Sequence, residues 1–98
     1  MTSQLRMYRA KEGELEAFID EWRTKILPLR RKFGFRVDGA WSIPATGEFI
    51  WIITYEGPEG FEARDTAYYA SAARKAVSPD PARHLAHTDT RLMTPVAR

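Results

Sequence analysis

The sequence contains no cysteine, and this absence excludes several classes of protein. Without cysteine there is no disulfide framework, thiolate nucleophile, zinc ribbon or iron–sulfur cluster. Long apolar runs are missing too, because the longest, residues 49–53, is far shorter than the roughly 20 residues of a membrane-spanning helix. The first residues lack the basic and then apolar pattern of a signal peptide. We therefore expect no membrane insertion and a soluble, cytoplasmic protein.

An excess of one charge is also absent, since 15 basic and 13 acidic residues leave a net charge of +2. A charge so small and evenly mixed argues against a nucleic-acid groove. The sequence has no Gly-rich phosphate loop, dinucleotide fingerprint, Gly-x-Ser-x-Gly elbow or paired-carboxylate motif. It therefore predicts no cofactor and does not support a nucleotide-dependent enzyme, a serine hydrolase or a glycosidase. The length of 98 residues predicts one domain over residues 1–98.

Hydrophobic periodicity predicts four strands. Alternating or β-prone residues occupy residues 4–9, 35–43, 48–56 and 87–93, and the second and third segments are joined by a turn at residues 44–47. The third segment is apolar on both faces, with Phe49, Trp51, Ile53 and Tyr55 on one and Ile50, Ile52 and Thr54 on the other.

Two further segments predict helices. Apolar residues spaced by three and four predict a long helix over residues 13–33, with acidic residues in its first half and basic residues in its second, as the helix dipole favours. Pro28 predicts a kink or a break there, and Gly34 predicts a left-handed cap at its end. Residues 61–70 predict a second, weaker helix.

The segment after the second helix contains two capping signals. Ser71 can cap a continuation of the helix through residue 77. Asp80 and Pro81 predict the cap and first position of a short turn over residues 82–85.

The resulting order, β-α-β-β-α-β, predicts an α+β protein with the ferredoxin-like arrangement, a four-stranded antiparallel sheet with its helices on one face. Two helices cover only one face of the sheet, yet the segment 48–56 is apolar on both. Packing against a second copy would bury the other face, so we expect a homodimer with a closed two-fold interface.

Several short segments resemble the NIPSNAP family. They are Gln4-Leu5-Arg6-Met7-Tyr8 followed by Gly13, then Leu27-Pro28, Gly34-Phe35, Gly39-Ala40-Trp41, residues 49–55 and Arg91-Leu92-Met93-Thr94-Pro95. The resemblance covers nearly the whole chain. It implies a dimeric α/β barrel, in which two ferredoxin-like protomers join their sheets, and it implies no catalytic positions. The turn at residues 44–47 departs from the Gly-Pro and Asn that many relatives carry there.

The four-residue turn sets an expected register between the second and third strands. The expected pairs are Ile43 with Glu48, Ala40 with Trp51, Asp38 with Ile53 and Arg36 with Tyr55, and a one-residue bulge would reverse the faces. The face that carries Phe49 and Trp51 has the composition of a small-molecule pocket and equally that of a packed interface, and packing is the commoner role of such aromatics.

Arg6 and Tyr8 share one face of the first strand, which is central in this fold. A central arginine needs a partner, and Asp38, Asp89 or Glu56 could form an ion pair with it. The alternative is that Arg6 holds an anionic group of a substrate. Tyr8 could donate a proton or a hydrogen bond to a substrate, or pack with its hydroxyl in water.

His84, His87 and Asp89 have an H-x-x-H-x-D spacing, but no companion metal motif is present, and we predict no metal site. A histidine, with Asp89 as a local partner, is a better candidate for a general base, against the alternative of a solvated surface residue.

The second helix places Tyr68 toward the sheet with Asp65 beside it. The resulting hypothesis is a cleft between sheet and helices that binds a small apolar or aromatic molecule. Tyr8, Trp41, Trp51, Tyr68 and His84 would line it, Arg6 would anchor a polar group, and Tyr8 and His84 would be the catalytic candidates. By analogy of fold the reaction would be that of a cofactor-independent oxygenase or isomerase. The competing hypothesis is a non-enzymatic scaffold dimer.

Overall fold

The computed structural model describes residues 1–97 and contains the expected elements in the expected order. The strands are β1 (Thr2–Ala10), β2 (Arg36–Ile43), β3 (Glu48–Tyr55) and β4 (Leu85–Met93). The helical segments are α1 (Leu15–Glu21), the π-helical η1 (Trp22–Ile26), α2 (Leu27–Lys32), α3 (Phe61–Ala70), α4 (Ala72–Lys75) and the 3₁₀ turn η2 (Pro81–His84). The α+β, ferredoxin-like prediction is thereby confirmed.

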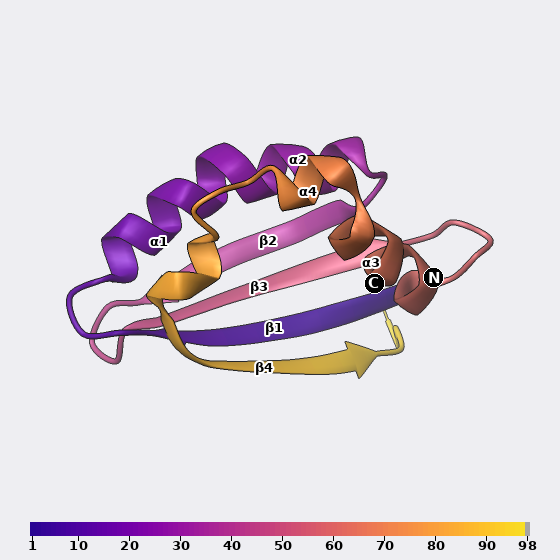
Figure 1. The fold of residues 1–98 in the computed structure, drawn as a ribbon. Coiled ribbons are helices and arrows are strands. Elements are labelled where there is room, and N and C mark those ends of the chain that lie inside the picture. Colours follow the sequence, from indigo (N-terminus) through magenta and orange to yellow (C-terminus); the bar gives the residue numbers. More distant parts are fainter. Residues whose placement is uncertain (98) are drawn as a thin grey trace.

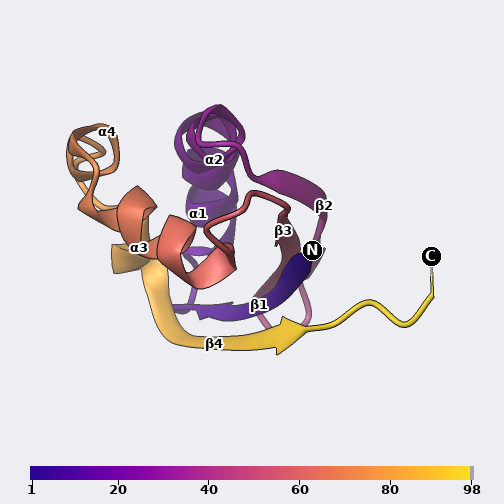
Figure 2. The same cartoon turned by 90° about the vertical axis from the view of Figure 1, so that its right-hand side faces the viewer.

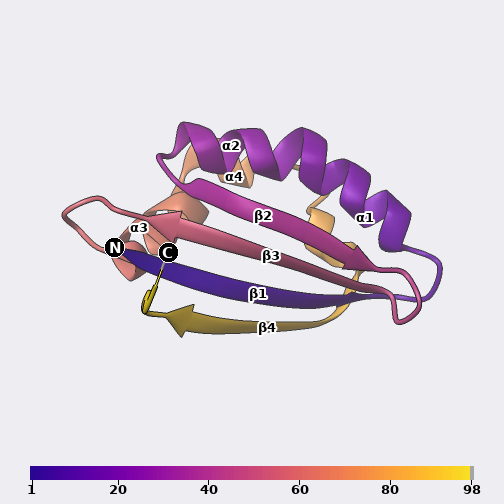
Figure 3. The ribbon, with the colours of Figure 1, turned by 180° about the vertical axis from the view of Figure 1, so that it is seen from behind.

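The four strands form one antiparallel sheet in the order β2-β3-β1-β4, so β1 is central and lies beside β3, as predicted. The helices lie over one face of this sheet, which curves beneath them (Figures 1 and 2). The other face is uncovered in the view from behind (Figure 3). None of the helices in residues 1–97 has the length and apolar character that a membrane span requires.

The long first helix continues through Pro28 instead of breaking there. The irregularity that proline imposes appears one turn earlier, as η1, where the backbone N–H of Leu27 donates to the carbonyl of Trp22, five residues before it. Pro28 has no N–H to offer the preceding turn, and a wider π-helical turn accommodates that loss without ending the helix. The buried apolar residues of the long helix, Phe18, Trp22 and Ile26, remain on one side, facing the sheet.

Gly34 ends this helix as predicted, with a φ of 90°. The backbone N–H of Phe35 donates to the carbonyl of Arg30 at 3.1 Å, which closes the last turn before β2 begins. A Cβ at position 34 would lie 3.6 Å from the Tyr55 ring, an ordinary contact, so the requirement for glycine comes from the backbone angle and not from space.

Aromatic rings fill the space between the sheet and the long helix. Phe49 of β3 contacts Phe18 and Trp22, with ring centroids 5.3 and 5.0 Å apart. Trp22 also contacts Trp51, at 5.3 Å. Edge-to-face pairs of this kind add to the free energy of burial and fix the rings in place.

The register of β2 against β3 is only half as predicted. Ile43 pairs with Glu48 and Ala40 with Trp51, but Val37 pairs with Ile53 and Arg36 with Thr54, because Asp38 is an extra residue in a bulge. The Asp38 carboxylate accepts hydrogen bonds from Arg36 and from the Thr54 hydroxyl, and these bonds hold the extra residue on the uncovered face. The predicted pairs of Asp38 with Ile53 and of Arg36 with Tyr55 are therefore wrong.

The cap at Gly34 can be tested by two substitutions that differ in backbone preference. Gly34→Ala should lower the free energy of unfolding by about 1 kcal/mol or more, because an L side chain disfavours positive φ. Gly34→Asn should cost less, because asparagine tolerates that region better than alanine does. Urea denaturation of both variants measures the difference. Equal losses would show that crowding, not backbone angle, selects glycine here.

Candidate functional site

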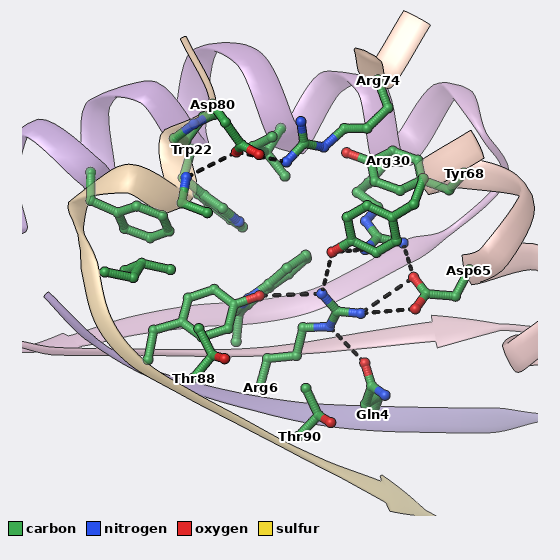
Figure 4. A pocket seen from close by; sticks show the side chains of 18 residues that line it. Gln4, Arg6, Trp22, Arg30, Asp65, Tyr68, Arg74, Asp80, Thr88 and Thr90 are labelled. Atoms are coloured by element: carbon green, nitrogen blue, oxygen red, sulfur yellow. Dashed lines mark hydrogen bonds and ion pairs between the residues drawn. The ribbon is translucent and has the colours of Figure 1, made fainter. Parts of the chain in front are cut away.

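A cavity of about 370 Å³ lies between the sheet and the helices. Its lining residues are Gln4, Arg6 and Tyr8 of β1, Phe18, Trp22, Ile26 and Arg30 of the long helix, Trp51 of β3, Asp65, Tyr68 and Tyr69 of α3, Arg74 of α4, Asp80, Pro81 and Ala82 at η2, and Leu85, Thr88 and Thr90 of β4. Its mouth is formed by the lining residues that are exposed, which are Tyr69, Asp80, Ala82, Thr88 and Thr90. Figure 4 labels Asp80, Thr88 and Thr90 among them. The volume of the cavity falls in the range of small-molecule sites.

Four of the six residues proposed from the sequence meet in this cavity. Arg6, Tyr8, Trp51 and Tyr68 all line it, and each is buried, with exposed fractions of 5%, 9%, 1% and 1%. They come from β1, β3 and α3, and the sheet register together with the position of α3 over the sheet brings them to one place.

Arg6 lies at the centre of the cavity floor and makes five hydrogen bonds, as many as its guanidinium has N–H donors. Nε donates to the Gln4 amide oxygen at 2.6 Å, and Nη2 donates to both carboxylate oxygens of Asp65 at 3.3 and 3.2 Å (Figure 4). Nη1 donates to the hydroxyl oxygens of Tyr8 and Tyr69, at 3.2 and 2.9 Å. Burial alone lowers the pKa of Arg6, but Tyr8 and Tyr69 outweigh burial and raise it.

The partner of Arg6 is therefore Asp65, and the three partners considered from the sequence were wrong. Asp38 and Glu56 pair with Arg36, and Asp89 pairs with Arg91. Asp38 and Asp89 lie on the uncovered face of the sheet, opposite to Arg6, because the bulge and the strand alternation direct them there. Glu56 follows the end of β3.

Asp65 has a second arginine partner. Arg30 of α2 is 1% exposed, and its Nη1 donates to the Asp65 carboxylate at 2.7 Å, while its Nη2 donates to the Tyr69 hydroxyl at 3.2 Å. Its guanidinium also lies 3.7 Å from the centre of the Tyr68 ring, a cation–π contact. Two buried guanidinium groups thus share one carboxylate.

The tyrosine hydroxyls of the cavity are placed as donors. Those of Tyr8 and Tyr69 accept hydrogen bonds from arginine, and among residues 1–97 neither hydrogen has an acceptor. The Tyr68 hydroxyl is buried without any partner in that part of the chain. Burial raises the pKa of Tyr68, so its hydroxyl stays protonated at neutral pH.

Further unpartnered polar atoms surround the same cavity. Across the described chain, the buried side-chain nitrogen and oxygen atoms without a hydrogen bond belong to Trp22, Arg30, Trp51, Tyr68 and Arg74. All of these residues line the cavity. Four of the five atoms are N–H donors and the fifth is a hydroxyl. Unsatisfied groups are costly in a core, so their concentration here indicates a site built to meet hydrogen-bond acceptors.

One side of the cavity is closed by η2 and α4. The Arg74 guanidinium pairs with the Asp80 carboxylate at 3.0 Å. The same carboxylate accepts from the backbone N–H of Ala82, and Ser71 caps α4 by accepting from the N–H of Arg74. Both predicted caps are confirmed, although α4 ends at Lys75, not at residue 77.

His84 does not reach the cavity, so the structure gives no support to its role as the base there. Its two ring nitrogens contact the carboxylates of Glu14 and Glu21, at 2.8 and 3.1 Å, not that of Asp89. Two carboxylates on both ring nitrogens favour the protonated ring, and the hydrogen bonds to Glu14 and Glu21 raise the pKa of His84. The contacts tie η2 to α1. Within residues 1–97, no group of three or more histidine, aspartate or glutamate side chains is arranged so that it could hold a metal ion.

Trp41 is also absent from this cavity. It pairs with Ile50 and lies on the uncovered face of the sheet, with 54% of its surface exposed and its ring over Gly39. The bulge at Asp38 does not change the face on which Trp41 lies. Trp41 lies between the bulge and the turn, so it keeps the β2–β3 register that the turn sets. The placement of Trp41 in the cleft was therefore wrong.

Three site residues escaped the sequence interpretation. Arg30 follows Trp22 and Ile26 by four-residue steps, and this spacing indicates a place on the buried side of the helix. The neighbouring basic residues nevertheless favoured a solvent-exposed interpretation. Tyr69 was not predicted, because the helical spacing from Phe61 and Asp65 selects its neighbour Tyr68. Arg74 gave no signal that distinguishes it from a surface arginine.

Comparison with known proteins gives a consistent picture. A family model described as NIPSNAP matches residues 3–98. The fold is similar to that of an uncharacterized NIPSNAP domain protein from Burkholderia xenovorans, with a TM-score of 0.85 and 19% identity over 99% of this chain and 96% of that chain. A NIPSNAP family protein from Agrobacterium tumefaciens gives a TM-score of 0.82 and 14% identity, covering 96% of this chain and 91% of that chain.

A third similar structure is that of an antibiotic biosynthesis monooxygenase, with a TM-score of 0.71 and 16% identity over 99% of this chain and 100% of that chain. Identities this low show a shared fold. No curated protein matches the chain.

The His84 contacts predict a pH dependence of stability. The pKa of His84 is raised above 6.5 in the folded state, so its contribution is complete below that pH and is lost as pH rises through the raised value. Arg83 lowers the pKa of Glu21 to about 2. The contribution of Glu21 to stability is therefore lost only as pH falls below 4.5. The urea midpoint of the wild type should therefore decline above pH 6.5, and His84→Gln should flatten the decline.

His87, the other histidine, is exposed and provides the matched control. His87→Gln should keep the decline of the wild type. A decline that survives in His84→Gln would show that another group is responsible.

Proposed function

Because the chain belongs to the NIPSNAP family, as its sequence segments suggested, we propose that it binds a small molecule with an apolar or aromatic body in the cavity between sheet and helices. The observation that carries this proposal is the cavity itself, about 370 Å³ lined by aromatic rings and a few inward polar groups. That combination is typical of small-molecule sites, where apolar walls supply affinity and few polar groups fix orientation.

The apolar part of the ligand would lie between the long helix and the sheet. Phe18, Trp22 and Ile26 contribute the helix side of the cavity, and Trp51 and Leu85 contribute the strand side. Trp22 and Trp51 meet nearly at right angles, with an interplanar angle of 75°, so they form a rigid corner for a flat ring.

For the reaction class we propose cofactor-independent oxygenation or isomerisation of the bound molecule, with Tyr8 as the proton-donating or hydrogen-bonding residue. The shared fold of an antibiotic biosynthesis monooxygenase supports testing oxygenation first. Tyr8 is supported by its place at the cavity floor beside Arg6, whereas His84 lies outside the cavity.

The binding proposal is tested by screening mono- and bicyclic aromatic compounds for a rise in melting temperature and measuring each hit by titration calorimetry. Ala82→Phe should weaken the binding of every hit by about tenfold or more, because the new ring occupies the mouth of the cavity. Hits are then mixed with protein in an oxygen electrode to look for consumption of oxygen.

Ala86→Phe is the matched control, since Ala86 is also exposed but does not line this cavity. It should leave binding unchanged. Hits that bind Ala82→Phe as tightly as the wild type would place their site elsewhere. A screen without hits would favour the scaffold alternative.

We also propose that two copies of the chain associate through the uncovered face of the sheet. Cross-strand register places Leu5, Met7, Ile50, Ile52 and Trp41 together on that face, and no helix of the described chain covers it (Figure 3). Asp89 and Arg91 of β4 border the patch with opposite charges. A two-fold axis would set such charges against each other and bury the apolar residues between the two sheets.

Trp41→Lys should convert the dimer to single chains of 11.3 kDa in sedimentation velocity, because it sets a charge in the proposed interface. Leu92→Lys is the control, since Leu92 is similarly exposed, at 50% against 54%, but pairs with Gln4 on the helix-covered face. Wild-type protein that sediments as single chains at micromolar concentration would contradict the proposal.

A further inference from the structure

We propose that the ligand of the cavity is a carboxylate, whose oxygens accept hydrogen bonds from the hydroxyl groups of Tyr8 and Tyr69 and whose charge balances the second buried arginine. This inference rests on the proposed function that the cavity binds a small molecule, and it specifies the chemical class of that molecule. It follows from three observations, which concern charge, donor geometry and the surrounding rings.

The first observation is an excess of positive charge in a buried place. Arg6 and Arg30 have side chains that are 6% and 1% exposed, and among residues 1–97 the only carboxylate that either pairs with is Asp65. The group therefore holds two positive charges and one negative charge. Buried charge without a counter-charge is strongly unfavourable, so a ligand that brings a negative charge is selected over a neutral or cationic one.

The second observation is the direction of the hydrogen bonds. Arg6 cannot itself receive the ligand, because its donors already serve Gln4, Tyr8, Tyr69 and Asp65. Tyr8 and Tyr69 accept from the same nitrogen, Nη1, so their hydroxyl oxygens lie on either side of one atom. Since each oxygen accepts from a cation, its own O–H is a strengthened donor, and both remain available to a ligand acceptor.

The two hydroxyl groups and the carboxylate of Asp65 contact different nitrogen atoms of the Arg6 guanidinium. Asp65 accepts from Nη2 of Arg6 and from Arg30, whereas the tyrosines accept from Nη1. A ligand carboxylate held by the tyrosines therefore approaches the guanidinium from the other nitrogen, so that two anions flank one cation. The hydroxyl groups of Tyr8 and Tyr69 lie close together because both contact Nη1 of Arg6. The two oxygens of one carboxylate are also close together, so one carboxylate can accept a hydrogen bond from each hydroxyl group.

The third observation fixes the orientation of the rest of the molecule. The Arg6 guanidinium lies 5.4 Å from the centre of the Trp51 ring, so the charged end of the cavity adjoins the corner formed by Trp51 and Trp22. A flat apolar body attached to the carboxylate would extend from Arg6 toward this corner. The class of ligand is therefore an aromatic or similarly flat apolar carboxylic acid in its ionised form.

Titration calorimetry of 1-naphthoate against its neutral amide, 1-naphthamide, tests this class, because the two probes share size and shape and differ in charge. The wild type should bind the carboxylate about tenfold or more tightly than the amide, as expected for hydrogen bonds to a charged acceptor. Tyr8→Phe and Tyr69→Phe should each reduce this preference several-fold. Both variants keep the aromatic ring, so the core packing is retained.

Tyr55→Phe is the control, since its hydroxyl donates to Glu59 outside the cavity, and it should retain the preference of the wild type. Equal binding of carboxylate and amide would overturn the inference and leave the proposed function intact. A preference that persists unchanged in both tyrosine variants would overturn the role of the hydroxyl groups. Absence of binding by either probe at millimolar concentration would overturn the inference together with the proposed function.

Discussion

The shared ion pair of Arg6, Asp65 and Arg30 is the interaction on which the arrangement of the site depends. It joins β1, α3 and α2, three elements that are far apart in the sequence. The helix α3 has only two buried residues, Phe61 and Tyr68, so apolar packing alone holds it weakly over the sheet. Asp65 lies between these two residues in the helix and adds charged contacts with Arg6 and Arg30. These contacts fix the rotation of α3 that turns Tyr68 and Tyr69 toward the cavity.

The cavity persists because rigid groups form its walls. Phe49 of the sheet makes edge-to-face contacts with Phe18 and Trp22 of the long helix. These packed rings prevent the helix from approaching the sheet more closely. On the other side, His84 ties η2 to α1 through Glu14 and Glu21, which keeps Ala82 at the mouth. His84 thus shapes the cavity without entering it.

The sequence predicted the features of the fold that arise from local periodicity. The apolar spacing of residues 13–33 and the alternation of the strands were sufficient for element order, and Gly34 and Asp80 marked ends through backbone chemistry that is local. The bulge at Asp38 was not predictable in the same way, because its cause is a contact with Thr54, which comes from another strand.

The same distinction separates the parts of the site. Arg6 and Tyr8 could be identified because residues two apart on a strand point to the same face of the sheet. Asp65 was noticed beside Tyr68, but its pairing with Arg6 spans 59 residues and could be seen only once α3 was placed over β1. Trp41 was misplaced for the opposite reason, since strand alternation leaves two faces and composition alone does not say which one the helices cover.

The number of arginines in the cavity supports the proposal that they serve ligand recognition more than stability. Replacing a buried ion pair by apolar residues of similar size is often neutral or stabilising, so a core that needed only to fold would favour such residues at positions 6 and 30. Instead two guanidinium groups share a single carboxylate, and unpartnered donors of Trp22, Trp51 and Arg74 belong to the same walls. An arrangement with so many donors and so few acceptors is unfavourable when empty and becomes favourable when an anionic ligand supplies the acceptors.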